Sequence, residues 1–142
     1  AILTLASKGL PYYTGGSIAV VDVQDVVNSM LLLMKSTAKN ERYILVSANV
    51  TYQNFTEHLA LAFGNKPPTK EIEQWKLLLA STFDFISSRL FGLKRRMLKT
   101  NVKSLYSKKN YSAHKIEARL KYRFTPVSET VIRVVKRYKM EQ

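Results

Sequence analysis

The sequence predicts an α/β fold that is mostly helical with a few short strands. Two apolar runs, residues 18–23 and residues 42–48, are rich in β-branched or aromatic residues, and each precedes a pattern typical of an amphipathic helix. After Gly64, apolar residues recur at helical spacing and no further strand pattern follows. With 142 residues, of which 46% are apolar, the chain is long enough to bury the core of one ordinary domain.

The first predicted strand passes directly into a helix. Residues 7–17 contain a proline and a glycine pair, which disfavour regular structure, and residues 18–23 then read as a short buried strand. Asp22 is placed to cap the helix that follows, with Asp25 as an acidic residue in its first turn. We expect this helix to end near Thr37. Its apolar face comprises Val26, Val27, Met30, Leu31 and Met34.

The second strand and helix repeat this order. Residues 42–48 predict a buried strand, and Thr51 then caps a helix that Gly64 ends in the C′ position. The apolar face of this helix comprises Phe55, Leu59 and Phe63. Two strands do not make a stable sheet by themselves, so the first half of the chain has the pattern of the end of a larger sheet.

A long helix is predicted next, with Thr69 as its cap, Glu71 and Glu73 in its first turn and Gly92 at its end. Its apolar stripe comprises Ile72, Trp75, Leu79, Phe83, Ile86 and Leu90. We interpret this stripe as core, because aromatic residues at helical spacing are usually buried in a globular domain.

Three shorter helices complete the second half. Residues 94–99 are predicted to form a short helix capped by Thr100, and another helix is expected after Ser112. In the last helix, Thr125 is the cap and Pro126 occupies the first helical position. The shared face of this last helix comprises Val127, Val131, Val134 and Tyr138.

Charge is distributed unevenly along the chain. The formal net charge is +13, and residues 1–64 are balanced, so the whole excess of Lys and Arg lies after Gly64. The densest basic cluster is Lys94, Arg95, Arg96, Lys99, Lys103, Lys108 and Lys109, with Tyr106 and Tyr111 nearby. Such a cluster suits a nucleic acid or an anionic membrane, and it equally suits a solvated face that keeps the protein in solution. No recognised nucleic-acid-binding motif accompanies the charge.

The sequence gives little support for a metal-binding protein or for a membrane-spanning protein. The chain has no cysteine, and its two histidines, His58 and His114, have no second ligand at zinc spacing. The longest apolar run, residues 77–93, is interrupted by Asp84 and Arg89, each costly at bilayer depth. We therefore expect a soluble or at most peripheral protein, in a reducing cytoplasmic setting.

Tyr111 and Lys115 have the spacing of the catalytic pair of short-chain dehydrogenases, in which a lysine lowers the pKa of a proton-transferring tyrosine. The chain, however, has no G-x-G-x-x-G turn to hold a dinucleotide. Ser112 would also cap the following helix and leave Tyr111 outside its first turn. We interpret Tyr111 as an amphipathic residue at the start of a helix.

Several motifs together resemble the carboxyl-terminal part of an extended short-chain dehydrogenase, in the NAD(P)-dependent epimerase/dehydratase family near its dihydroflavonol reductase-like branch. These are "VDVQDV" at residues 21–26, "YILV" at residues 43–46 with the helix containing Tyr52, and "GNKPP" at residues 64–68. The terminal signature of the family resembles the pattern formed here by Tyr111, Lys115, Ile116, Leu120 and Tyr122. Lys121 stands where the family usually has the glycine of a left-handed helix end, which suggests a differently shaped turn.

The resemblance implies that this chain lacks the catalytic Tyr-Lys pair and the Gly-rich cofactor turn, which precede the Val-Asp-Val turn in the family. It implies two parts, residues 1–64 as the last strand-helix units of a Rossmann-like domain and residues 65–142 as a helical lobe covering the substrate, forming one compact unit. The expected substrate-binding residues are Tyr12, Tyr13, Thr14, Gly15, Gly16, Arg96, Met97 and Lys99.

The resemblance also implies the partners. The parent enzyme would use NAD or NADP, neither of which we expect to bind this chain alone. Expected partners are the missing amino-terminal cofactor-binding half, a small hydroxy, keto or nucleotide-sugar substrate and a second copy in a homodimer, with nucleic acid and membrane disfavoured. The alternative is a small basic module that binds nucleic acid or an anionic membrane surface.

Overall fold

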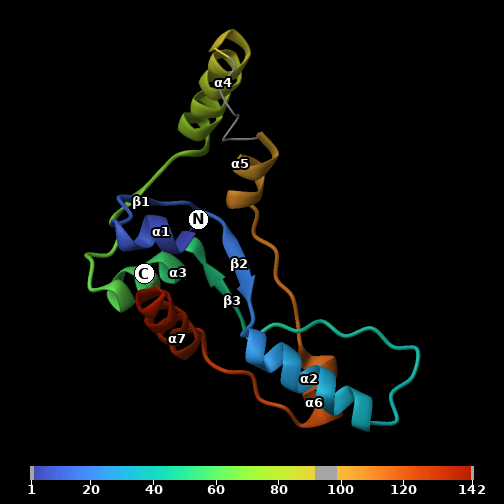
Figure 1. Ribbon diagram of the computed structural model, residues 1–142. Coiled ribbons are helices and arrows are strands. Elements are labelled where there is room, and N and C mark those ends of the chain that lie inside the picture. Colours follow the sequence, from blue (N-terminus) through green and yellow to red (C-terminus); the bar gives the residue numbers. More distant parts are fainter. Residues whose placement is uncertain (1, 92–98, 142) are drawn as a thin grey trace. The chain divides into compact units, whose positions relative to one another are not determined.

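The computed structural model describes residues 2–91 and 99–141, and over these residues the chain is an α/β protein, mostly helical with a few short strands (Figure 1). The chain forms two compact units that alternate along the sequence. The first comprises Ala1–Ser17 and Thr51–Lys108, and the second comprises Ile18–Val50 and Lys109–Gln142. Residue 64, the predicted boundary, lies inside the first unit, because the helix that it ends packs against the amino-terminal segment.

In the first unit, helix α1 (Ile2–Ser7) packs on helix α3 (Tyr52–Phe63). Thr51 caps α3 by accepting from the backbone N–H of Asn54, and Gly64 ends it in the left-handed conformation, both as predicted. The side-chain amide of Asn65 donates to the carbonyl of Ala6 at 2.8 Å, which ties the end of α3 to α1. Helix α1 had no counterpart in the sequence prediction.

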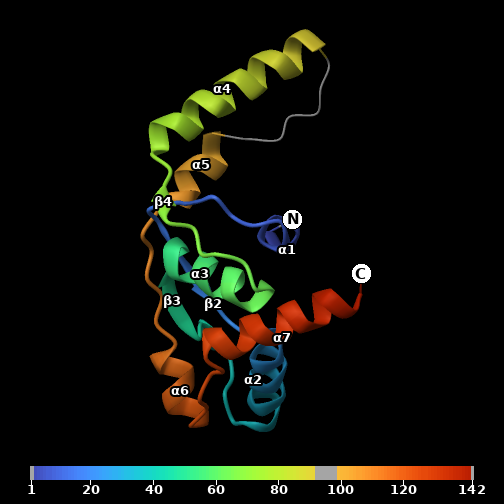
Figure 2. The same cartoon turned by 90° about the vertical axis from the view of Figure 1, so that its left-hand side faces the viewer.

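The rest of the first unit is a small parallel strand pair and two helices. Strand β1 (Tyr12–Tyr13) pairs in parallel with β4 (Lys70–Glu71). Helix α4 (Gln74–Phe91) follows β4, and α5 (Lys99–Leu105) lies beside the start of α4 (Figure 2). The buried apolar residues of this unit are Ala6, Leu59, Ala60 and Val102.

The second unit is formed by helices α2 (Val23–Lys35), α6 (His114–Leu120) and α7 (Val127–Met140). Strand β2 (Ser17–Val20), which begins at the end of the first unit, pairs with β3 (Ala48–Thr51). The core of this unit consists of Val46, Ala113, Ile116 and Phe124. Tyr122 packs edge-on against Phe124, with ring centroids 5.3 Å apart, and closes this core from one side.

Two predictions of strand and helix position were wrong. Residues 42–46 form no strand, and the strand is Ala48–Thr51, although the side chain of Val46 is buried as the apolar run suggested. Lys70 and Glu71, predicted in the first turn of a helix, instead pair with β1, so α4 begins only at Gln74. In both cases the strand forms where its backbone pairs with a strand that is distant in the sequence.

The helix ends differ in detail from the predictions. Helix α2 ends at Lys35 rather than near Thr37. Thr100 lies inside α5 instead of capping a preceding helix, and residues 94–98 and Gly92 lie outside the described residues. The hydroxyl of Ser112 accepts from the backbone N–H of His114, so it still serves the start of α6. Pro126, and not Thr125, is the N-cap of α7, so this helix begins one residue later than predicted.

The predicted face of α7 was correct in part. Val127 and Val131 are buried as expected, together with Thr130 and Val135. Val134, predicted on this face, is 39% exposed. Residues 127, 131 and 135 follow each other at intervals of four, so they lie on one face of the helix. Val134 lies outside this face.

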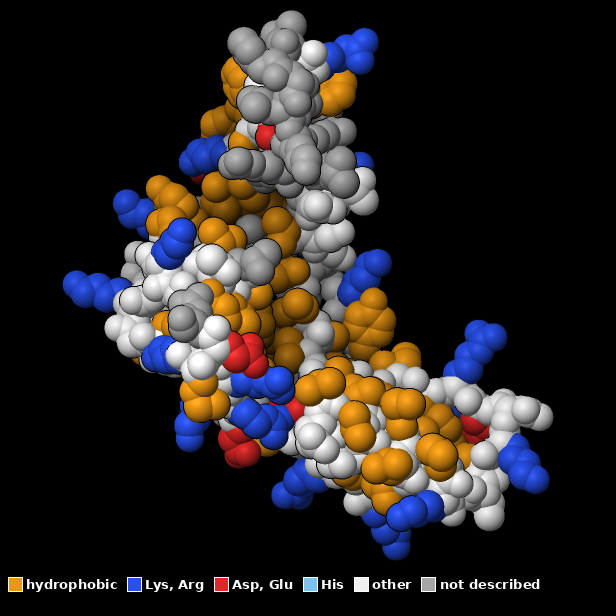
Figure 3. All heavy atoms as spheres, viewed as in Figure 1, with side chains coloured by type: hydrophobic (Ala, Val, Ile, Leu, Met, Phe, Trp, Pro, Cys, Tyr) orange, Lys and Arg blue, Asp and Glu red, His pale blue; other side chains and the backbone are white. Residues whose placement is uncertain are grey.

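The apolar stripe of α2 faces outward. Its exposed members, which we call the α2 stripe, are Val27, Met30, Leu31 and Met34 of the predicted face, together with Val23; the predicted member Val26 is partly buried. All five are exposed, and Val23 and Met34 reach 75% and 80%. Hydrophobic side chains gather over α2 on the face seen in Figure 3. The opposite side of the helix, which carries Asp25 and Ser29, is buried. This arrangement is the reverse of an ordinary surface helix, which buries its apolar side.

The apolar stripe of α4 is also exposed, contrary to its interpretation as core. We call its described members, Trp75, Leu79, Phe83 and Ile86, the α4 stripe. Phe83 is 71% exposed and Trp75 is 54% exposed. Among the described side chains of this helix, that of Ser81 is fully buried, and its hydroxyl donates to the carbonyl of Leu78. A helical repeat of apolar residues has the same sequence pattern whether it faces a core or another partner.

Candidate functional site

The predicted substrate-facing loop, residues 12–16, is held from three directions within the first unit. The backbone N–H of Ile72 donates to the carbonyl of Tyr13 at 2.9 Å, next to the β1–β4 pairing. The N–H of Tyr52, at the start of α3, donates to the carbonyl of Gly16 at 3.1 Å. Ser17, directly after the loop, donates to the carbonyl of Ser107 at 2.9 Å. The loop is therefore positioned by β4, α3 and the segment that follows α5.

The two glycines of the loop are needed for close approach. A Cβ atom on Gly16 would lie 2.3 Å from the carbonyl oxygen of Leu105, at the end of α5, and 2.9 Å from that of Ser107. A Cβ atom on Gly15 would lie 2.3 Å from Oε1 of Glu71, the tip of an exposed side chain. Backbone cannot move aside easily, whereas a side-chain tip can, so Gly16 is the stricter requirement.

Tyr106 closes one side of the loop. Its hydroxyl donates to the carbonyl of Ile72, directly after β4. Burial raises the pKa of Tyr106, and the nearby carboxylates of Glu71 and Glu73 raise it further. The phenol therefore stays protonated near neutral pH and serves as a structural donor rather than as a proton-transferring group.

The loop offers polar groups to a bound molecule. Tyr12 is 50% exposed, whereas Tyr13 and Thr14 are partly buried and Gly16 is buried. Together with the exposed carboxylate of Glu71, the phenol and hydroxyl groups supply both donors and acceptors. Such a set can hydrogen-bond hydroxyl or carbonyl groups of a small substrate, and it contains no nucleophile paired with a base.

Three of the predicted substrate-binding residues belong to the segment at the start of α5. Arg96 and Met97 lie outside the described residues. Lys99 begins α5, and nothing about its side chain is described. The carboxyl-terminal end of the same helix, at Leu105, reaches the loop.

Sequence reasoning missed two residues of this site. Glu71 was assigned to the first turn of a helix, and Tyr106 was noted only as a neighbour of the basic cluster. Their places depend on the pairing of β1 with β4, a contact between residues about 60 positions apart that no local pattern marks.

Lys115 is engaged in a different role from catalysis. In the second unit its ammonium group lies 3.0 Å from the carboxylate of Glu41 and donates to the carbonyl of Arg42 at 3.3 Å. It also lies 4.8 Å from the ring centroid of Tyr43. The hydrogen bond and charge of Lys115 lower the pKa of Glu41. Tyr111 lies outside α6, where its backbone groups pair with the side chain of Asn49.

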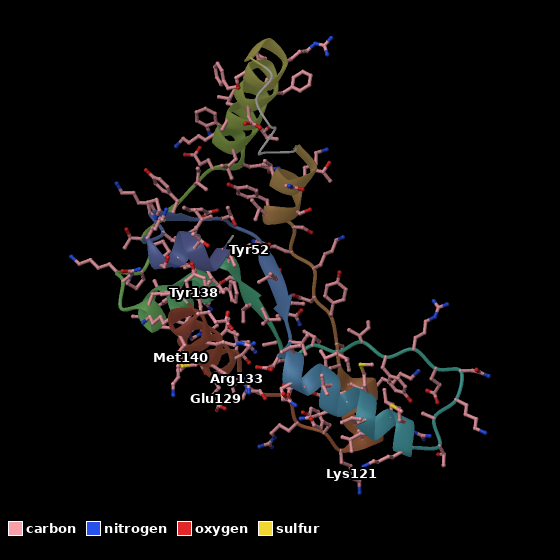
Figure 4. All side chains as sticks on the ribbon, viewed as in Figure 1. Tyr52, Lys121, Glu129, Arg133, Tyr138 and Met140 are labelled. Atoms are coloured by element: carbon pink, nitrogen blue, oxygen red, sulfur yellow. The ribbon has the colours of Figure 1, made fainter. Side chains whose placement is uncertain are left out.

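The buried carboxylate of Asp22, at the start of α2, has a structural role. Asp22 caps α2 by accepting from the N–H of Gln24 at 2.8 Å, as predicted, and it also pairs with Arg133 of α7 (Figure 4). Burial raises the pKa of Asp22, but the amide of Gln24, the hydroxyl of Thr130 and the Arg133 guanidinium outweigh this effect and bring the pKa below its usual value. A carboxyl of this kind stays ionised and is a poor general acid.

The turn between β2 and α2 is a poor site for the pyrophosphate of a dinucleotide. The β2–α2 turn, the place at which a Rossmann unit holds its pyrophosphate, consists of Val21 and Asp22 and has no glycine. The buried carboxylate of Asp22 would repel a pyrophosphate there. We therefore assign no cofactor contact to this turn.

No set of three His, Asp or Glu side chains among the described residues is placed to hold a metal ion. Within the same residues, no helix has the length and apolar character required to cross a membrane.

Comparison with known proteins shows a similarity of fold. No protein-family model and no curated protein matches the chain. Its fold is similar to that in the crystal structure of gox2253, with a TM-score of 0.74 and 23% sequence identity. The similarity covers 99% of this chain and 42% of gox2253, so the chain spans less than half the length of that protein. At this level of identity the likeness is one of fold.

Proposed function

We propose that this chain is the substrate-binding, carboxyl-terminal portion of an NAD(P)-dependent epimerase, dehydratase or reductase with a Rossmann-like cofactor domain. The substrate would be a small hydroxy or keto compound or a nucleotide sugar. The catalytic Tyr-Lys pair and the Gly-rich cofactor turn would belong to the other half of the enzyme. The proposal rests on the family resemblance of the sequence together with one structural observation.

The observation that carries the proposal is the outward-facing α2 stripe. Five aliphatic or sulfur-containing side chains are exposed on one side of α2, while Asp25 and Ser29 are buried on the other. Exposed apolar surface of this kind marks a contact with another protein surface. The likeness to 42% of gox2253 supports the same view, because there the fold accompanies a longer chain.

The loop at residues 12–16 supplies the substrate role in this proposal. Its phenol and hydroxyl groups would bind oxygen atoms of the substrate, and Gly16 would keep the loop against α5. The chain would thus orient the substrate, and the absent half would bring the nicotinamide and the proton-transferring tyrosine. Cytoplasmic location is part of the same proposal.

The experiment is an assay with NADH and NADPH of the chain alone and of the chain joined to the polypeptide encoded upstream of it. We expect no nicotinamide turnover by the chain alone and reduction of a carbonyl substrate by the joined protein. In the joined protein, Thr14→Ala should raise KM by roughly tenfold through the loss of one substrate hydrogen bond, whereas Thr4→Ala on α1 should leave it unchanged. Turnover by the chain alone, or equal effects of the two variants, would contradict the proposal.

A further inference from the structure

A polar pocket of the second unit lies between α6 and the loop that follows α2. It has a volume of about 310 Å³ and is lined by Glu41, Tyr43, Lys115, Ala118 and Arg119. Lys115 and Arg119 are four positions apart on α6, so their side chains lie on the same face of the helix. Both cations contact the loop, Lys115 at Glu41 and Arg42, and Arg119 at Thr37.

The carboxylate of Glu41 is an internal anion in this pocket. The ammonium group of Lys115 lies 3.0 Å from it. Lys115 lowers the pKa of Glu41 most strongly, and the hydroxyl of Tyr43 and the charge of Arg119 lower it further. Three groups from two segments of the chain therefore stabilise one negative charge, so the pocket already has the chemistry of an anion receptor.

Two of these three groups have donors to spare. The guanidinium of Arg119 carries five N–H donors, and the partner that it contacts at 3.2 Å is the neutral hydroxyl of Thr37. The hydroxyl of Tyr43 is buried and makes no hydrogen bond with the described groups, although it faces Glu41 closely enough to lower its pKa. A buried donor without an acceptor is costly, so an anion with more oxygens than a carboxylate gains by accepting from it.

The surroundings of the pocket carry an excess of positive charge. Residues 35–43 and 114–120 contain five Lys or Arg and two Glu, namely Lys35, Lys39, Arg42, Lys115 and Arg119 against Glu41 and Glu117. Glu117 is two positions from both Lys115 and Arg119, so it lies on the other side of α6. Glu41 alone leaves this excess uncompensated, and a dianion compensates more of it.

Glu41 can be displaced from the pocket at little cost. Its side chain is 37% exposed, that of Lys115 is 58% exposed, and an ion pair between exposed groups contributes little to stability. The loop that carries Glu41 forms no helix or strand from residue 38 to residue 46. The carboxylate can therefore turn toward solvent while the rest of the unit keeps its fold.

We propose that this pocket binds a phosphate group, which displaces the carboxylate of Glu41. The phosphate oxygens would accept from Lys115, Arg119 and the hydroxyl of Tyr43. The group is either free phosphate or the monoester of a larger molecule. The proposal does not depend on the proposed enzymatic role, because all the lining residues belong to the second unit and the loop at residues 12–16 belongs to the first.

Calorimetric titration of the chain with inorganic phosphate, with chloride used to hold the ionic strength constant, measures the binding. We expect saturable binding at one site, and binding of acetate that is weaker by roughly tenfold, because acetate has one charge and two oxygens. Methyl phosphate separates the two sources. Binding as tight as that of phosphate assigns the site to a phosphate ester, weaker binding assigns it to the free ion, and both support the proposal. Absence of saturable phosphate binding, or equal binding of acetate, would overturn it.

Removal of the internal anion should strengthen binding. Glu41→Gln should tighten the affinity for phosphate by roughly tenfold, because a competing negative charge is lost. A misfolded variant would not give this result. Glu117→Gln makes the same change of net charge on the other side of α6 and should leave the affinity unchanged. Equal gains from the two variants would mean that only the net charge matters, which contradicts a site at Glu41.

Removal of a cation from the pocket should have the opposite effect. Arg119→Gln should weaken phosphate binding by roughly tenfold through the loss of a charge-assisted hydrogen bond. The matched control is Arg123→Gln, at an exposed position shortly after α6, which should leave binding unchanged. Equal losses from these two variants would show that phosphate is held by the general positive charge of the protein, and the proposed site would be rejected.

Discussion

The hydroxyl of Tyr122 donates a hydrogen bond of 2.7 Å to the buried carboxylate of Asp25, although the two residues are 97 positions apart. The same carboxylate accepts from the backbone N–H of Thr125 at 2.7 Å and from its hydroxyl at 2.9 Å. The hydroxyl of Thr125, which was predicted to cap α7, therefore binds a residue of α2 instead. Asp25 fastens the first turn of α2 to the segment between α6 and α7.

Replacement of Asp25 should strongly destabilise the second unit. Asp25→Ala removes three hydrogen bonds and leaves their donors unpaired, so we expect the free energy of unfolding to fall by roughly 3 kcal/mol. Urea denaturation measures the change. Glu117→Ala, at an exposed position of α6, is the control and should change stability by less than about 0.5 kcal/mol. Similar values for the two variants would show that the Asp25 cluster does not hold the unit together.

Asp22 should contribute to the pH dependence of stability. The pKa of Asp22 in the folded protein is below its ordinary value of 3.8. A carboxyl with a lowered folded pKa adds stability above its unfolded pKa and loses it as the pH falls through the folded pKa. The stability difference between the wild type and Asp22→Asn should therefore be constant near neutral pH and shrink below about pH 4. Urea midpoints over this range test it, and a difference that does not change with pH would contradict it.

Lys121 adopts a conformation that favours glycine. Its φ is 50° and its ψ is 36°, so the turn is left-handed, and the expectation of a differently shaped turn was wrong. Figure 4 labels Lys121 at the end of α6. Lys121→Gly should raise the free energy of unfolding by about 1 kcal/mol, because glycine adopts this region without a Cβ clash. The matched control is Lys136→Gly inside α7, which should lower stability by about 1 kcal/mol. Thermal unfolding that shows destabilisation by both variants would contradict the prediction.

The two loop glycines should respond differently to an added methyl group. Gly16→Ala places a Cβ atom against the Leu105 carbonyl and should cost about 1–3 kcal/mol of stability. Gly15→Ala meets the movable carboxylate of Glu71 and should cost much less. Chemical denaturation of both variants measures the difference. Equal costs would mean that the end of α5 does not press on the loop as described.

Local features of this fold could be predicted from the sequence, and long-range ones could not. The caps at Asp22 and Thr51 and the helix end at Gly64 were correct, because each depends on a few neighbouring residues. The strand at residues 42–48 was wrong, because a strand forms only where a partner backbone lies beside it.

The residues of the candidate site could likewise be predicted only where the signal is local. The glycine pair of the loop could be identified from its sequence, but Glu71 and Tyr106 reach the loop through the β1–β4 pairing and the end of α5. Similarly, the stripe of α4 was predicted correctly as a helical repeat and wrongly as core. The spacing of apolar residues defines a face but does not say what covers it.

We propose that this chain is the substrate-binding end of a larger NAD(P)-dependent enzyme. The most direct measurement is the sequence of the coding DNA upstream of the codon for Ala1. We expect an open reading frame that continues upstream through a Gly-rich strand-helix turn and then a Tyr-x-x-x-Lys helix. A start codon directly before that of Ala1 would contradict it.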